Sequence, residues 1–192
     1  VSDVFECIRT NSKRIQARKL FDYNIVLIGF MGTGKSTISD FLKNVFAMDV
    51  AEMDQIIAQR QGMSISDIFE TYGEQYFRDL ETNLLIEMQS RSNVVISCGG
   101  GVPMGEENRK NMKQYGTVVL LTARPETIFQ RVCHDQNRPL LKDHMNVEYI
   151  ASLMAQRQPY YEQAADVTVS TDGKTPAEIS REVAALLAQR QH

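Results

Sequence analysis

A short segment near the start of the chain has the residue types and spacing that bind phosphate. It fits the pattern G-x-x-x-x-G-K-[ST] and reads Gly29-Phe30-Met31-Gly32-Thr33-Gly34-Lys35-Ser36. Glycines let the backbone turn tightly and aim N–H groups at phosphate oxygens, and a following helix adds partial positive charge. In such a loop the lysine reaches the β- and γ-phosphates and the serine hydroxyl ligates Mg²⁺. The motif predicts that MgATP binds at Gly32, Thr33, Gly34, Lys35, Ser36 and Thr37.

A phosphate-binding loop alone does not say where the phosphate goes. A guanine-nucleotide switch should carry an N-K-x-D motif, which this sequence lacks. A motor ATPase normally has a longer chain and a strand that ends in acidic residues, whereas the third candidate strand here ends in Gly99-Gly100-Gly101. The pattern therefore favours a kinase that acts on a small acceptor.

Two carboxylates stand at the end of the second candidate strand. Glu52 and Asp54 fall close to the place where strand ends face the phosphate-binding loop in an open α/β sheet. A carboxylate there can hydrogen-bond an acceptor hydroxyl, take up its proton, or order water around magnesium. The alternative is that Asp54 is an ordinary acidic helix cap.

Three arginines are candidates for recognising a charged group on the acceptor. Arg78 lies three residues before Glu81 in a long helical stretch, Arg138 lies in a polar segment, and Arg157 lies on a later helix. Alone, each fits a solvated surface arginine, and Arg78 with Glu81 fits a surface ion pair. Arginine forks bind planar carboxylates, whereas Asp54 suits neutral hydroxyls, and a glycine triplet can lie against a ring. Together they predict a polyhydroxylated carboxylic acid as the acceptor.

The elements that must position these residues follow a regular alternation. From residue 24 onward, short apolar runs alternate with longer amphipathic stretches, which indicates βαβ units and a parallel sheet. The expected strands cover residues 24–28, 50–53, 94–98, 117–121 and 166–170. The expected helices begin at residue 35 and cover residues 64–89, 106–114, 125–134, 147–163 and 176–189. A break is expected in the second helix near Tyr72 and Gly73, and residues 133–145 are expected to form a mobile loop.

Composition narrows the class of protein further. The chain has 192 residues, of which 43% are hydrophobic and 23% charged, which is typical of one globular domain. A formal charge of -3 gives no general basic field, so we expect no nucleic-acid partner. No apolar run approaches the roughly 20 residues that span a bilayer, so we expect no membrane partner. Three scattered cysteines fit neither a disulfide framework nor a metal site, which favours a reducing cytoplasm.

Six ordered motifs make the sequence resemble the shikimate kinase family over residues 24–190. They are the phosphate-binding loop, Asp54-Gln55-Ile56-Ile57, Phe77-Arg78-x-x-Glu81, the glycine triplet, Arg138-Pro139-Leu140-Leu141 and Arg157-x-Pro159-x-Tyr161. The resemblance implies ATP-dependent phosphorylation of a shikimate hydroxyl to give shikimate 3-phosphate, in aromatic amino-acid biosynthesis. It also implies a three-layer α/β/α P-loop kinase fold with a five-stranded parallel sheet and a mobile lid near residues 137–143.

The resemblance also implies roles for individual residues. Shikimate is held by Asp54, Arg78, Gly99, Gly100, Gly101 and Arg157, with Arg78 and Arg157 on its carboxylate. Lys35 and Arg138 stabilise charge on the transferring phosphoryl group, and Asp54 orients or deprotonates the acceptor hydroxyl. Ser36 ligates Mg²⁺, and Arg131 lies beside the adenine ring.

One position departs from the family pattern. Many members have aspartate two residues before the position of Asp54, where this chain has Glu52. The longer side chain can still reach magnesium through water, as Asp54 can, but the role of Glu52 is open.

Two other functions fit part of the same pattern. Another small P-loop kinase, such as a gluconate kinase, also takes a hydroxy acid, although the Phe77–Glu81 motif and the glycine triplet count against it. A non-catalytic nucleotide-binding regulatory module is the second, although the set Lys35, Ser36, Asp54 and Arg138 counts against lost catalysis.

The division of the chain into parts is a separate expectation. Residues 23–192 read as one kinase domain, expected to be monomeric, and residues 1–22 read as a basic amphipathic helical extension. The extension either packs on the domain or ends an upstream domain, because residues 4–8 and 12–16 are similar to the last helix of helical chorismate mutases.

Overall fold

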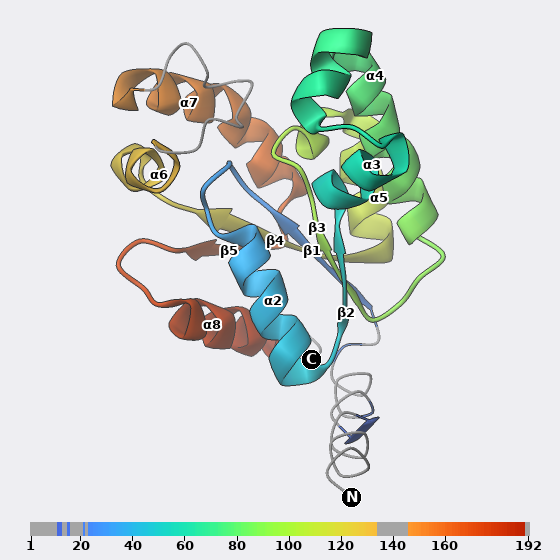
Figure 1. The fold of residues 1–192 in the computed structure, drawn as a ribbon. Coiled ribbons are helices and arrows are strands. Elements are labelled where there is room, and N and C mark those ends of the chain that lie inside the picture. Colours follow the sequence, from blue (N-terminus) through green and yellow to red (C-terminus); the bar gives the residue numbers. More distant parts are fainter. Residues whose placement is uncertain (1–10, 13–14, 16–20, 22, 134–145, 191–192) are drawn as a thin grey trace, which may run out of the picture.

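Five short strands form one parallel sheet at the centre of the molecule (Figure 1). The computed structural model describes residues 11–12, 15, 21, 23–133 and 146–190. Within these residues the strands are β1 (Asn24–Ile28), β2 (Asp49–Glu52), β3 (Val94–Ser97), β4 (Gly116–Thr122) and β5 (Val167–Ser170). Their order in the sheet is β2-β3-β1-β4-β5, and every neighbouring pair is parallel. The predicted five-stranded parallel sheet is confirmed.

Helices cover both faces of this sheet (Figure 1). The described helices are α2 (Lys35–Phe46), α3 (Met53–Gln61), α4 (Ile65–Met88), η1 (Val102–Met104), α5 (Glu106–Tyr115), α6 (Pro125–Val132), α7 (Val147–Ala164) and α8 (Pro176–Gln189). α2 and α8 pack together on one face, and α4, α5 and α7 lie on the other. This is the predicted three-layer α/β/α arrangement.

The alternation of side chains along the strands explains why both faces need cover. Ile25 and Leu27 of β1 join the core cluster on the α2 and α8 face, whereas Val26 and Ile28 join the cluster on the opposite face. Successive side chains of a strand point to opposite faces, so an all-apolar strand must be buried on both. All five residues of β1 are buried, in agreement with the apolar runs seen in the sequence.

Register places three connecting segments at one edge of the sheet. Ser97 of β3 is in register with Leu27 of β1 and with Glu52 of β2, so the carboxyl ends of the three strands are level. The loop after β1, the carboxylates after β2 and the glycines after β3 therefore emerge side by side. Ligands of open α/β sheets bind at such an edge.

The predicted helix signals are confirmed where they are strongest. α4 begins after Ser64, whose hydroxyl accepts the N–H of Asp67 while the Asp67 side chain accepts the N–H of Ser64. α8 begins in the same way, with Thr175 and Glu178. The expected break in the long helix falls at Gly73, where φ is 83° and ψ is 170°. These local signals act within a few residues, so the sequence carries them completely.

Some element boundaries differ from the prediction. The helix α3 was not expected, and the second strand ends at Glu52 because α3 begins at Met53. Only Met53 and Ile57 of α3 are buried, so its sequence shows no clear apolar stripe. β3 ends at Ser97 and not at residue 98, and α6 ends at Val132 before the predicted end at residue 134.

Two predicted features lie wholly or mostly outside the described residues. These are the mobile lid, with Arg138, and the helical extension over residues 1–22. Phe21 is described, and it is buried in the core cluster on the α2 and α8 face. The side-chain amide of Asn93 donates to the carbonyl of Phe21 at 2.7 Å. Among the helices in the described part of the chain, none is long and apolar enough to cross a membrane.

Candidate active site

The loop between β1 and α2 has the shape of a phosphate-binding loop. Gly29 has φ of 144°, and a Cβ added there would lie 2.3 Å from the carbonyl oxygen of Leu121, so only glycine fits. The backbone N–H of Thr33 donates to the carbonyl of Phe30, and the Thr33 hydroxyl donates to the same oxygen at 2.8 Å. Thr33 is buried, and both its hydroxyl and its backbone N–H bond within the loop, so this residue stabilises the shape of the loop.

The ammonium group of Lys35 lies over this loop. Its Nζ donates to the carbonyl of Gly29 at 2.9 Å and to the carbonyl of Phe30 at 3.2 Å. Lys35 is the first residue of α2, so a positive side chain and the partial positive charge of the helix N-terminus act at the same place. The arrangement can stabilise an anion.

A pocket of about 400 Å³ opens beside the loop. It is lined by the predicted nucleotide-binding residues Gly32, Gly34, Lys35, Ser36, Thr37 and Arg131, by the predicted carboxylates Glu52 and Asp54, and by Met31, Gln55, Ser97 and Cys98. We call it the polar pocket. Its walls come from the loop after β1 with the start of α2, from the end of β2 with the start of α3, from the end of β3, and from α6.

Oxygen ligands for a hard cation are present in the polar pocket. The Ser36 hydroxyl donates to Oε2 of Glu52 at 3.0 Å, which places the predicted metal ligand against a carboxylate. Among the described residues there is no group of three or more acidic, histidine or cysteine side chains that would hold a metal ion by themselves. Mg²⁺ rarely needs such a group, because it retains water and takes phosphate oxygens together with one or two protein oxygens. The residues present therefore fit a magnesium ion that arrives with a nucleotide.

Arg131 closes the pocket from α6. Its guanidinium donates to the carbonyl of Gly32 at 3.0 Å, to the Thr171 hydroxyl at 3.0 Å and to the Thr171 carbonyl at 3.2 Å. Arg131 thus connects the phosphate-binding loop with the segment that follows β5.

The predicted acceptor residues meet at the glycine triplet after β3. A Cβ added to Gly101 would lie 2.2 Å from Nη1 of Arg78, and one added to Gly99 would lie 2.7 Å from Oδ1 of Asp54. Residues with side chains would displace both groups. A Cβ on Gly100 would lie 3.6 Å from Nη1 of Arg157. The triplet is therefore where a carboxylate from α3 and guanidinium groups from α4 and α7 converge.

Arg78 is held by two carboxylates of its own helix. Its Nη1 donates to Oε2 of Glu81 at 2.6 Å, and its Nε and Nη2 donate to Oε1 of Glu74 at 3.2 Å and 2.7 Å. A guanidinium has two N–H groups on each terminal nitrogen. One on Nη1 and one on Nη2 remain after these bonds, which is the pair that a planar carboxylate accepts.

Glu81, which pairs with Arg78, has an environment that the sequence did not reveal. A surface ion pair with Arg78 was one interpretation of the sequence, but the Glu81 side chain is 1% exposed and its Oε1 has no hydrogen-bond partner among the described residues. Burial raises the pKa of Glu81 to about 7, although neighbouring Arg78 acts in the opposite direction. The spacing of three residues is the same in a surface pair and a buried one, so only tertiary packing distinguishes them.

Arg157 approaches the triplet from the opposite side. It is 9% exposed, and its Cζ lies 5.7 Å from the centre of the Phe30 ring, in a cation–π contact. One turn later on α7, the Tyr161 hydroxyl donates to the carbonyl of Gly100 at 2.7 Å. Tyr161 was noted in the sequence only as part of a motif, although its spacing of four from Arg157 is a signal for a shared helix face.

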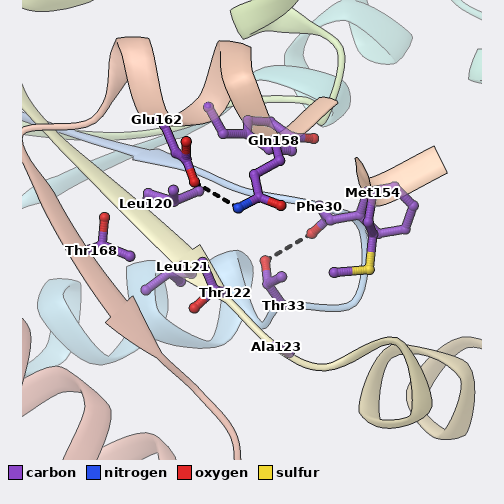
Figure 2. A pocket seen from close by; sticks show the side chains of 11 residues that line it. Phe30, Thr33, Leu120, Leu121, Thr122, Ala123, Met154, Gln158, Glu162 and Thr168 are labelled. Carbon is purple, nitrogen blue, oxygen red and sulfur yellow. Dashed lines mark hydrogen bonds between the residues drawn. The ribbon is translucent and has the colours of Figure 1, made fainter. Parts of the chain in front are cut away.

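A second pocket, of about 410 Å³, also has the phosphate-binding loop as a wall. Figure 2 shows Phe30 and Thr33 of that loop facing Met154 and Gln158 of α7, with the end of β4 beneath. Hydrocarbon and aromatic side chains predominate in its lining, and the polar pair Gln158 and Glu162 bond to each other at 2.7 Å. We call it the apolar pocket. Lys35, Asp54, Arg78 and Arg157 do not line it.

Comparison with known proteins gives the family. The family model described as Shikimate kinase matches residues 31–188. Shikimate kinase from Persephonella marina is 42% identical over 160 residues, which cover 83% of this chain and 96% of that protein. The solved structure of shikimate kinase from Acinetobacter baumannii in complex with shikimate superposes with a TM-score of 0.86 at 32% identity, covering 92% of this chain and 98% of that one.

A more distant structure bears on the alternative kinase. A gluconokinase from Sinorhizobium meliloti 1021 superposes with a TM-score of 0.54 at 20% identity, covering 88% of this chain and 94% of that one, which shows a common fold only. The family model spans Lys35 and Ser36, the glycine triplet and both arginines of the acceptor side. The chain belongs to the shikimate kinase family.

Proposed function

We propose that this shikimate kinase transfers the γ-phosphoryl group of ATP in the polar pocket, to a hydroxyl of shikimate that rests on the glycine triplet. The product is shikimate 3-phosphate. One observation carries the proposal: Asp54, Arg78 and Arg157 converge on the triplet, next to the loop that carries Lys35. A hydroxylated ring with one carboxylate matches these groups, because arginine recognises the carboxylate and Asp54 accepts from a hydroxyl.

The chemistry assigned to these residues is mainly alignment and charge stabilisation. Phosphoryl transfer passes through a loose transition state, so positioning and positive charge supply most of the catalysis. Lys35 stabilises charge on the transferring group from the loop side. Asp54 orients the acceptor hydroxyl and takes its proton as the new O–P bond forms and the bond from the γ-phosphorus to the bridging oxygen of the leaving ADP breaks. Arg138, which is also predicted to stabilise charge on the transferring group, lies outside the described residues.

The acceptor's carboxylate is assigned to the two arginines. Arg78 offers one N–H from each terminal nitrogen, and its other donors are fixed by Glu74 and Glu81. Because Glu81 is buried, it keeps Arg78 from turning away. Arg157 is stacked near Phe30 and adds a second charge at the triplet.

Magnesium is assigned to Ser36, with Glu52 and Asp54 acting through water. The ion would neutralise charge on the β- and γ-phosphates. The hydrogen bond from Ser36 to Glu52 supports this assignment, because it directs the serine proton away and leaves the oxygen lone pairs for a cation. Arg131 is assigned to the adenine side of the nucleotide, which its position between the loop and Thr171 supports.

The remaining assignments concern the context of the enzyme. We infer a cytoplasmic location, because Cys98 and Cys133 are free thiols and a reducing compartment keeps thiols in that state. A monomeric kinase domain and a chorismate mutase-like upstream domain stay predictions.

The experiment that tests the proposal is a coupled ADP-release assay with three conditions. We expect ADP release with shikimate and only background release with gluconate or with no acceptor. Release with gluconate at the same rate would favour the alternative kinase. Nucleotide binding without release under any condition would favour the regulatory module.

A further inference from the structure

Glu52 is held between two serines of α2. The Ser36 hydroxyl donates to its Oε2 at 3.0 Å, and the Ser39 hydroxyl donates to its Oε1. Ser39 is 0% exposed, whereas Glu52 is partly exposed and lines the polar pocket. Each carboxylate oxygen therefore receives one hydroxyl proton from the same helix, and the carboxylate cannot rotate without losing one of these bonds.

The Ser39 proton has two acceptors within reach, and one of them is stronger. Ser39 Oγ lies 3.0 Å from the backbone carbonyl of Ser36 and closer still to the carboxylate of Glu52. A hydroxyl has a single proton to donate, and hydrogen bonds to a charged acceptor are about twice as strong as neutral ones. The proton is therefore committed to Glu52.

The length of the Glu52 side chain allows it to contact both serines. An aspartate at this position would be one methylene shorter. The longer arm reaches both serines from the end of β2, whereas an aspartate from the same backbone would fall short of at least one. Glutamate at this position thus needs an anchor, and the buried Ser39 provides it.

We propose that Ser39 is a positioning residue that fixes Glu52, and through Glu52 the Ser36 hydroxyl, for the divalent cation of the nucleotide. Once Ser36 gives its only proton to Glu52, its oxygen lone pairs are left for the cation. Partners of this kind orient a metal ligand without touching the metal, and their loss commonly weakens metal binding. The inference rests on the proposed function only for the presence of the cation.

A merely structural role is the competing explanation, and the chain offers a matched control. Ser180 of α8 is also buried, at 1% exposure, and its hydroxyl has no hydrogen-bond partner among the described residues. Ser180→Ala removes a buried serine hydroxyl without touching Glu52. It measures what the loss of such a group does by packing alone.

The test measures the affinity of Mn²⁺ for the enzyme saturated with ADP. The EPR signal of free Mn²⁺ reports how much of the ion is unbound during the titration. We expect Ser39→Ala to weaken Mn²⁺ binding about tenfold, with the affinity for ADP in chelator unchanged. Ser180→Ala should leave both values unchanged. Glu52→Asp should weaken Mn²⁺ as Ser39→Ala does, and Ser39→Ala added to Glu52→Asp should have little further effect, because the contact is already lost.

Two results would overturn the inference. One is a Ser39→Ala variant, folded by its thermal melt, that binds Mn²⁺ as the Ser180→Ala variant does. The other is a double variant whose losses add in full, which would mean that Ser39 acts independently of Glu52. The Mn²⁺ titration contains no shikimate, so neither result bears on the identity of the acceptor. If the unaltered enzyme failed to release ADP with shikimate, the proposed function would fail, but the Mn²⁺ titration could still be interpreted.

Discussion

Two pockets of nearly equal volume, about 400 Å³ and about 410 Å³, use the phosphate-binding loop as a wall and differ in almost everything else. The polar pocket gathers Lys35, Ser36, Glu52 and Asp54 from two segments at the carboxyl edge of the sheet, one after β1 and one at the end of β2. The apolar pocket is lined mainly by α7 and the end of β4 (Figure 2). Size alone does not distinguish them.

The difference between the two pockets indicates that charge and hydrogen-bond donors, and not volume, identify the site of phosphoryl transfer. A triphosphate needs positive charge and N–H donors, and a hydrocarbon wall supplies neither, so it would leave charge uncompensated. The polar pocket supplies both and adjoins the triplet where Arg78 and Arg157 meet. The chemistry is therefore expected on one side of the loop only, and changes on the two sides should have different consequences.

The largest effect should come from the lysine of the loop. Lys35→Met removes the charge that faces the transferring phosphoryl group, and we expect kcat to fall about 10³-fold, as when one transition-state donor is lost. Thermal stability should change little, because the ammonium donates to the carbonyls of Gly29 and Phe30, which belong to its own loop. Steady-state kinetics and a thermal melt on the same sample measure both. A kcat within tenfold of the unaltered enzyme would show that transfer takes place elsewhere.

The buried carboxylate of Glu81 should make the free energy of unfolding depend on pH. Its folded pKa of about 7 lies above the ordinary value of 4.5, so the folded state holds the Glu81 proton more tightly than the unfolded state does. Stability should therefore decline as pH rises from about 4.5 to about 7 and then level off, by about 3 kcal/mol in total.

Glu81→Gln removes this titration, so the variant should lack that decline. Urea denaturation at several pH values measures the difference in free energy of unfolding between the two proteins. If the difference stayed constant across the window, Glu81 would be ionised throughout, and the raised pKa would be wrong.

The arginine of the acceptor side should affect shikimate more than ATP. Arg78→Ala removes a paired charge-assisted hydrogen bond, so the KM for shikimate should rise about 30-fold, which corresponds to about 2 kcal/mol. The KM for ATP should be unchanged. Arg60→Ala is the matched control, because Arg60 also pairs with a glutamate, Glu87, but on the exposed surface. Equal KM values for shikimate in the Arg78→Ala and Arg60→Ala variants would rule out the carboxylate assignment.

The smallest effect is expected on the apolar side of the loop. Met154→Ala enlarges the apolar pocket, and because Met154 is only partly buried the cost should be about 1 kcal/mol of stability. The kcat and both KM values should stay within twofold. A tenfold loss of kcat would mean that the two pockets are not functionally distinct.

The sequence predicted most of the fold because its signals were local. β1 was correct at both ends, since an apolar run followed by glycines fixes it. α8 was correct at both ends, and its start is fixed by the capping pair Thr175 and Glu178. The helix α3 escaped prediction, because only Met53 and Ile57 of it are buried and its polar residues hide the period.

The candidate site also has parts that the sequence predicted and parts that it did not. The loop with Lys35 and Ser36 could be read directly, because backbone geometry and motif spacing determine each other. The burial of Glu81 and the contact of Ser39 with Glu52 could not, because both depend on how α2, α4 and the ends of β2 and β3 pack together. A pattern of spacing does not say which of two similar ion pairs is covered by the rest of the chain.

The most direct test of the account is a crystal structure with ADP and shikimate bound. It should show the phosphates of ADP on the loop beside Lys35, and the shikimate carboxylate on Arg78 and Arg157 with a ring hydroxyl at Asp54. The apolar pocket should hold neither molecule. Shikimate bound between α7 and β4, or bound with its carboxylate away from both arginines, would contradict the account.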